Sequence, residues 1–205
     1  LLLPPPRPRA PRKVISPAAV ETGPFLPGGV WFCFSCFGAG TPARSDYHPW
    51  LSLLARKNQT GGDIGMVLAS LAMTPHPPFV AALPQAALAN PDGPLAVFGH
   101  VDLAFSYSFG GNERGRSRRA AKFATALEQL VRGRRAGVAL DALMRDFREV
   151  NNDLAKLQQR RQQSPAGAQE DPDGVLCASL FMLRNDLKNF MLLGDPAVRL
   201  PVDVG

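Results

Sequence analysis

Cysteine and histidine are scarce in this chain, and it has no long apolar run. The 205 residues include only three cysteines and three histidines. An odd number of cysteines fits no closed disulfide framework, so we expect free thiols and a reducing, cytoplasmic compartment. The densest apolar run, residues 30–37, is far shorter than the roughly 18 residues that a membrane span needs. The composition therefore argues against a disulfide-stapled or membrane-spanning protein.

Length and composition indicate one ordinary domain with a hydrophobic core, or a large fragment of a larger protein. Residues 1–24 contain seven prolines and a basic cluster, which predicts a linker or extended arm. Residues 25–205 are the predicted folded unit. The chain begins with Leu1 and not with methionine, and no signal-like apolar segment follows, so we expect its native start to lie upstream.

Basic residues outnumber acidic ones by 23 to 17, and much of the excess lies in residues 114–122 and 132–135. Such groups attract phosphate. Interleaved aromatic or base-reading residues are absent, and a basic loop beside an exposed helix is more common than a binding site. The pattern therefore argues against nucleic acid as the partner.

Hydrophobic periodicity predicts an α/β fold with core strands and surface helices. Residues 30–37 are apolar on both faces, the pattern of a central, parallel strand. Residues 43–77 have many turn formers and predict a long irregular excursion. The remaining predicted elements are a helix over 79–89 shortened or kinked by Pro84, strands over 95–101 and 190–193, and three helices that end near 131, 160 and 187.

Cys36 stands at the predicted carboxyl end of the first strand, and Gly38, Gly40 and Pro42 follow it. In open α/β sheets, ligands and chemistry collect at this edge. A thiol held from behind, beside a loop where a substrate backbone can come close, meets the needs of a thiolate nucleophile. The simpler alternative is core filling, since free cysteine is among the most buried residue types.

Cys33 and Cys36 also form a Cys-x-x-Cys pair, a spacing found in zinc sites and redox dithiols. Residues three apart on a strand point to opposite faces, however, and the sequence has no second ligand pair. Cys177 falls in a predicted helix. We therefore predict no metal and no other cofactor.

Four segments read Phe-Ser-Cys-Phe-Gly-Ala-Gly-Thr-Pro (34–42), Leu-Pro-Gln-Ala (83–86), Leu-Ala-Val-Phe-Gly-His-Val-Asp (95–102) and Leu-Gly-Asp-Pro-Ala-Val-Arg-Leu-Pro (193–201). In this order they resemble the caspase-like cysteine peptidases, in the group that includes gingipain-type and CHAT-domain peptidases. The match runs with gaps from about residue 30 to 201. It implies a three-layer α/β sandwich with a mostly parallel sheet and flanking helices, of which this chain carries the C-terminal part.

The resemblance also implies a mechanism. In that family a cysteine attacks a peptide carbonyl, and a histidine on the preceding core strand assists proton transfer to the leaving amine. Cys36 takes the nucleophile role by position, its N–H helps to hold the oxyanion, and Gly38 and Gly40 belong to the active-site loop. No histidine lies upstream of His48, so the resemblance predicts a partner histidine on residues outside this chain.

Other polar residues are candidates for the edge of the site. His48 is a candidate substitute base, whereas His76 suits a surface turn. His100 shares the sheet edge with Cys36, with a hydrogen-bonded structural histidine as the alternative. Asp102 or Asp46 would supply negative charge for a basic substrate side chain. Asp195 is predicted to cap a turn.

Three functions remain open. The first is a cysteine endopeptidase domain with a polypeptide substrate and a histidine supplied elsewhere. The second is an inactive caspase-like fold that binds a protein partner as a scaffold. The third is a basic interaction domain that uses residues 114–119. The sequence leaves the oligomeric state open.

Overall fold

The computed structural model describes residues 14–56, 64–71, 77–105, 113–163 and 174–202. Helices and strands both occur, so the fold is mixed α/β, as predicted. In chain order the elements are α1 (Pro17–Glu21), β1 (Val30–Phe32), β2 (Gly40–Thr41), α2 (His48–Arg56), α3 (Ile64–Ser70), β3 (Phe79–Val80), α4 (Ala82–Ala89), β4 (Ala96–His100), α5 (Glu113–Val131), α6 (Ala136–Gln163), α7 (Gly174–Lys188) and β5 (Phe190–Gly194).

The main sheet has three strands in the order β1-β4-β5. β1 runs parallel to β4, with Val30 opposite Ala96. β5 runs antiparallel to β4, with Leu192 opposite Phe98. The sheet formed by the described residues is therefore mixed, whereas the resemblance to the caspase-like peptidases implied a mostly parallel one. β2 and β3 form a separate antiparallel ribbon.

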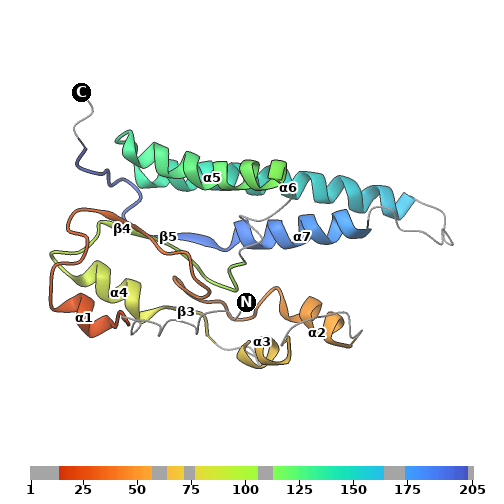
Figure 1. Cartoon of the computed structure of the whole chain (residues 1–205), viewed down its shortest axis with the longest axis horizontal. Helices are drawn as coiled ribbons and strands as arrows, with labels where there is room; N and C mark the ends of the chain where they lie inside the picture. Colours follow the sequence, from red (N-terminus) through yellow and green to blue (C-terminus); the bar gives the residue numbers. More distant parts are fainter. Residues whose placement is uncertain (1–13, 57–63, 72–76, 106–112, 164–173, 203–205) are drawn as a thin grey trace, which may run out of the picture.

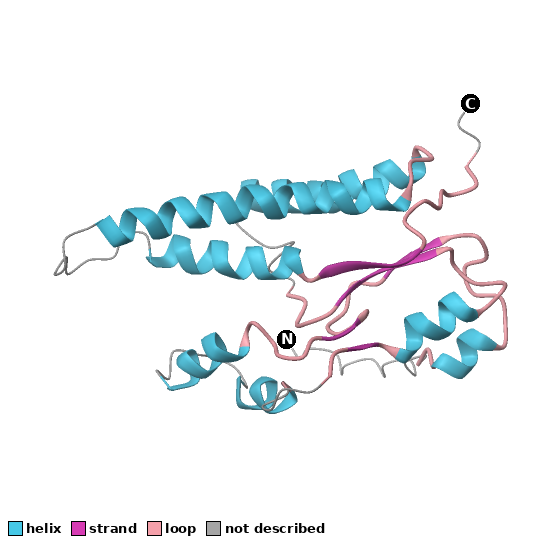
Figure 2. Ribbon diagram, turned by 180° about the vertical axis from the view of Figure 1, so that it is seen from behind, coloured by secondary structure: helices cyan, strands magenta, loops and turns pink. Residues whose placement is uncertain are grey.

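The sheet lies between helices. α5 and α6 run side by side along one face, and α1 and α4 lie on the other (Figures 1 and 2). The core against α5 and α6 combines Phe98 and Phe190 from the strands with Phe123 and Leu143 from the helices. Every residue of β4 is buried, as expected for a strand that has neighbours on both edges and cover on both faces.

The first strand is shorter than predicted. It ends at Phe32, although the N–H of Cys33 still donates to the carbonyl oxygen of Phe98 over 2.7 Å. Among the described strands β1 pairs only with β4, so a sequence typical of a central strand lies at an edge of this sheet. The residues after β1 are still apolar because their side chains pack against other elements. Phe34 contacts Phe123 and Phe190, and Phe37 packs against a second cluster.

Part of the predicted arm is folded. Ser16 caps α1 through its Oγ, Pro17 stands in the first turn, and Val20 is buried. The Nδ2 of Asn90, after α4, donates to the carbonyl oxygens of Val20 and Gly23. Residues 16–23 therefore belong to the folded body, because a side-chain cap, one buried apolar side chain and the two Asn90 hydrogen bonds hold them on α4.

The helices follow the apolar stripes closely, and the predicted excursion contains two more. α2 and α3 lie within residues 43–77, where the sequence predicted irregular structure. Pro84 shortens the predicted helix as expected: it lies in the first turn of α4, where its missing N–H is not needed. The predicted start of the last helix at residues 171–172 lies outside the described residues.

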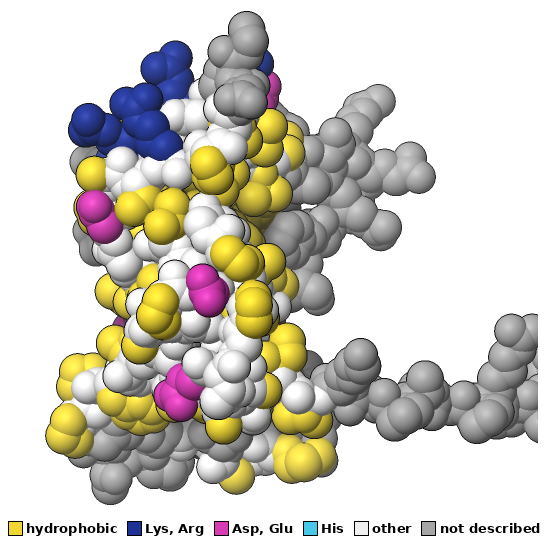
Figure 3. Space-filling model, turned by 90° about the vertical axis from the view of Figure 1, so that its left-hand side faces the viewer, with side chains coloured by type: hydrophobic (Ala, Val, Ile, Leu, Met, Phe, Trp, Pro, Cys, Tyr) yellow, Lys and Arg dark blue, Asp and Glu magenta, His cyan; other side chains and the backbone are white. Residues whose placement is uncertain are grey.

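Basic side chains gather at one end of the molecule, over the turn between α5 and α6 (Figure 3). Arg132, Arg134 and Arg135 are exposed there, and Arg132 pairs with Glu128 on the preceding turn. The side chains of residues 114–119 lie outside the described part. No helix within the described ranges is long and apolar enough to cross a membrane.

Candidate functional site

Cys36 lies at the tip of a turn beyond the carboxyl end of β1. The N–H of Phe37 donates to the carbonyl oxygen of Asp102, and the N–H of Ala39 donates to that of His100. The chain thus passes beyond the end of β4 and then turns back along it. Phe37 makes the reversal with a φ of 57°, a strained conformation for a bulky residue. Packing of its ring beside Tyr47 and Leu103 offsets this cost.

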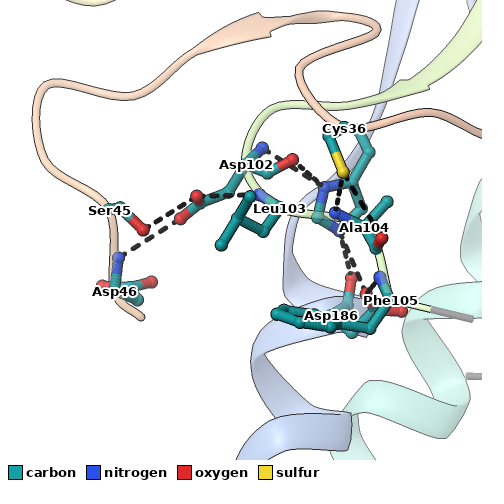
Figure 4. Close-up of polar contacts among 9 residues, drawn as sticks. Cys36, Ser45, Asp46, Asp102, Leu103, Ala104, Phe105 and Asp186 are labelled. Atoms are coloured by element: carbon teal, nitrogen blue, oxygen red, sulfur yellow. Dashed lines mark hydrogen bonds and ion pairs between the residues drawn. The ribbon is translucent and has the colours of Figure 1, made fainter. Parts of the chain in front are cut away.

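The thiol of Cys36 is exposed and contacts the main chain of Ala104. The N–H of Ala104 lies 3.3 Å from Sγ, and the carbonyl oxygen of Ala104 lies 3.5 Å from it (Figure 4). The Ala104 N–H donates to sulfur, and the thiol donates to the Ala104 carbonyl oxygen, so the sulfur is held beside this residue. The alternative that Cys36 fills the core does not fit this exposed position.

His100 ends β4 and is wholly buried. Its Nε2 lies 3.0 Å from the carbonyl oxygen of Asp186. Its Nδ1 lies 2.9 Å from the carbonyl oxygen and 3.2 Å from the N–H of Asp102. Backbone groups therefore occupy both ring nitrogens, and neither is left for the thiol. This geometry fits the alternative in which His100 is a hydrogen-bonded structural histidine.

The Asp102 side chain joins the loop before α2 to the end of β4. Its Oδ1 accepts from the Ser45 hydroxyl and the Leu103 N–H, both at 2.8 Å, and its Oδ2 accepts from the N–H of Asp46 at 3.2 Å (Figure 4). Burial raises the pKa of this carboxyl above its ordinary value, and the three donors oppose the shift. A carboxylate that is 1% exposed and has three donors holds the loop before α2 against the end of β4.

Asp186 contributes from the last turn of α7. Its carboxylate accepts the N–H of Phe105 at 3.0 Å, and the same Oδ1 lies 3.6 Å from His100 Nε2. Its side chain is almost fully buried. Through its main-chain oxygen and its carboxylate together, Asp186 connects α7 both to the end of β4 and to the segment that contacts Cys36.

Tyr47 packs beneath this network, with its ring 5.0 Å from that of Phe105 in an edge-to-face contact. Burial raises the pKa of its hydroxyl well above the ordinary value, and the nearby charges of Asp186, Asp102 and Asp46 and the Cys36 thiol add to the effect. The phenol therefore stays protonated at neutral pH.

Glycines allow the turn to lie close to its neighbours. A Cβ on Gly99 would lie 2.9 Å from the Cβ of Ala39, and one on Gly40 would lie 2.3 Å from the carbonyl oxygen of Phe79. Gly38 directs its own N–H back to the carbonyl oxygen of Ser35. Of the two predicted loop glycines, Gly40 thus starts the β2–β3 ribbon, and Gly38 closes the Cys36 turn.

The other predicted site residues lie around this centre. His48 is partly buried and begins α2, and its N–H lies 3.4 Å from the Ser45 carbonyl oxygen. The exposed carboxylate of Asp46 binds the ammonium group of Lys188. Asp195 accepts the N–H of Ala197, which confirms the predicted turn cap. His76 lies outside the described residues.

An apolar cavity of about 470 Å³ opens beside the same loop. Its lining comes from the start of the β2–β3 ribbon, from the residues around Phe79 and from β5. No sequence pattern indicates this cavity, because its walls come from segments that only the fold brings together. The lining residues are Ala39, Thr41, Pro42, Ala43, Pro78, Phe79, Val80, Val101, Met191 and Leu193.

Two polar groups at the centre of the site, Ser45 and Asp186, were missed by sequence reasoning. A signal existed for Asp186: it is an acidic residue between Leu183 and Leu187, on the buried stripe of α7. An acidic residue on a buried face needs partners. Ser45 carries no such signal, since an isolated serine among turn formers is commonplace.

Comparison of the chain with protein-family models, with curated proteins and with solved structures finds no match. The geometry described above is therefore the basis for assigning a function.

Proposed function

We propose that this chain carries the nucleophile of a caspase-like cysteine peptidase, built on a three-layer α/β sandwich. The observation that supports this most is the exposed Cys36 thiol, held on a strained turn beyond the parallel strand pair β1–β4, with the Ala104 N–H at 3.3 Å from Sγ. Strained turns and oriented backbone donors are typical of nucleophile positions.

The proposed reaction is peptide-bond hydrolysis in two steps. The thiolate of Cys36 adds to the carbonyl carbon of a substrate peptide, the C–N bond breaks, and the amine leaves with a proton that a histidine delivers. A thioester on Cys36 remains. Water then adds to its carbonyl carbon, and the C–S bond breaks to release the carboxylic acid and restore the thiol.

The histidine of this dyad is not His100, because both of its ring nitrogens are occupied by the backbone of Asp102 and Asp186. We propose that it comes from a strand beside the open edge of β1, the edge that faces away from β4. A strand there would end at the same side of the sheet as Cys36 if it ran parallel to β1.

The test is covalent labelling with an electrophilic arginyl or lysyl peptide. It is applied to the 205-residue chain, to any longer form of the protein that its gene encodes, and to each with Cys36→Ala. Cys177→Ala is the matched control, because this partly buried cysteine lies on α7. Labelling that is lost in Cys36→Ala and kept in Cys177→Ala supports the proposal, whereas no labelling of either form overturns it.

A catalytically inactive scaffold is the second candidate. The observation that favours it is the use of two buried polar side chains. His100 and Asp102 are bound to backbone groups and to Ser45, so they fix the loops and neither acts as a base at the thiol. A protein partner recovered equally well by the wild type and by Cys36→Ala, without cleavage, would select this function.

A further inference from the structure

We infer that Asp186 is a positioning residue for Cys36: it fixes the segment that carries the Ala104 N–H, and thereby an oriented donor on the thiol. This inference rests on the proposed function of Cys36 and adds a residue from α7 to that site.

The first step is the link from α7 to the segment after β4. The Oδ1 of Asp186 accepts the N–H of Phe105 at 3.0 Å, and Asp186 is 1% exposed. A buried charge-assisted hydrogen bond of this kind has well-defined geometry. Phe105 is the next residue after Ala104, so this bond also fixes the peptide unit next to the thiol.

The second step is the link from that segment to sulfur. The N–H of Ala104 lies 3.3 Å from Cys36 Sγ, across 68 positions in sequence. The Phe37 N–H, which donates to the carbonyl oxygen of Asp102, joins the two segments nearby. The Leu103 N–H bonded to Asp102 supports the segment from one side, and Asp186 supports it from the other.

The third step is the rigidity of Asp186 itself. Its main-chain oxygen accepts from His100 Nε2 at 3.0 Å, and Leu187 beside it is fully buried. The end of α7 is therefore fixed to β4 independently of the carboxylate. Removal of the carboxylate should release residues 104–105 and leave the helix in position.

The experiment compares the wild type with Asp186→Asn and Asp186→Ala. Iodoacetamide is reacted with each protein near neutral pH, and the rate at each cysteine is read by mass spectrometry. Asparagine keeps an oxygen acceptor for the Phe105 N–H, whereas alanine has none. We expect Asp186→Ala to slow alkylation of Cys36 about tenfold, the order of one hydrogen bond to a charged group. We expect Asp186→Asn to retain most of the wild-type rate.

Cys33 and Cys177, both partly buried, report on the rest of the fold. Simple unfolding would speed up all three thiols, so a selective slowing at Cys36 marks a positioning effect. An unchanged or faster Cys36 rate in a folded Asp186→Ala protein would overturn the inference, as would equal slowing in the alanine and asparagine variants.

If Asp186→Ala does not fold, amide hydrogen exchange of the wild type decides. The inference requires slow exchange at Ala104 and Phe105, and exchange as fast as in an open loop would contradict it. The alkylation result can be separated from the proposed function, because iodoacetamide reacts with a thiol without the help of a catalytic histidine. Selective slowing without labelling by the peptide electrophile would retain the role of Asp186 and reject the peptidase.

Discussion

The Nε2 of His100 lies 3.0 Å from the main-chain oxygen of Asp186, so the end of the central strand is joined to the last turn of α7. The ring also contacts Phe190 edge-to-face, with 5.0 Å between centroids. A histidine with these contacts stabilises the fold. Any effect of its removal on activity would follow from the loss of stability.

His100→Ala should therefore destabilise the protein by about 3 kcal/mol, since it removes a buried ring and leaves the Asp186 carbonyl oxygen without this donor. The free energy of unfolding in urea measures the loss. His48→Ala, at a partly buried position that begins α2, is the matched control and should cost less than half as much. Equal losses would contradict a structural role specific to His100.

Gly99→Ala should destabilise the protein by about 1–3 kcal/mol, because the new Cβ would meet Ala39 at 2.9 Å and push the Cys36 turn away from β4. Gly23→Ala is the control, since a Cβ at Gly23 has nothing within 4 Å, and it should change stability by less than about 0.5 kcal/mol. Thermal unfolding of both variants provides the comparison. A neutral Gly99→Ala would mean that the turn is not held against β4.

Asp102 should make stability depend on pH. Burial raises its pKa in the folded state above the ordinary 3.8. Between 3.8 and the raised value the folded state holds a proton that the unfolded state has lost, so stability falls as pH rises through this window. Asp102→Asn cannot titrate. The stability of the wild type relative to Asp102→Asn should therefore decrease as pH rises from about 3.8. An increase over the same range would show that the hydrogen bonds outweigh burial.

Asn90→Ala should weaken the attachment of α1 by about 2 kcal/mol, because two hydrogen bonds, to the carbonyl oxygens of Val20 and Gly23, are lost. Hydrogen exchange over residues 17–21 should become faster. Asn152→Ala, on the exposed face of α6, is the control and should leave this exchange unchanged. Unchanged exchange in Asn90→Ala would mean that other contacts hold α1.

The helices were predictable because their signal is local. The stripe of Leu143, Val150, Leu154 and Leu157 recurs at helical spacing, and each of these residues is buried on α6. Gly133 closes α5 with a positive φ, as expected of a C-terminal glycine. Such patterns depend on neighbours three or four residues apart, which a sequence shows directly.

The end of β1 was not predictable in this way. The mostly apolar residues 33–37 suit a buried strand, but here they form a turn in which Phe34 and Cys36 are exposed and Phe37 packs against other elements. The approach of Cys36, His100 and Asp102 to one edge was foreseen from the ends of two strands. The contribution of Asp186 was not, because it depends on where a distant helix finishes.

The pairing of β4 has a consequence for how the protein acquires its structure. Ala96 pairs with Val30 far upstream and with Gly194 near the end of the chain, whereas α5 and α6 adjoin each other in sequence. Local contacts form early, and long loop closures form slowly. The helical hairpin can therefore form during synthesis, but the sheet, and with it the setting of Cys36, is completed only after the last strand leaves the ribosome.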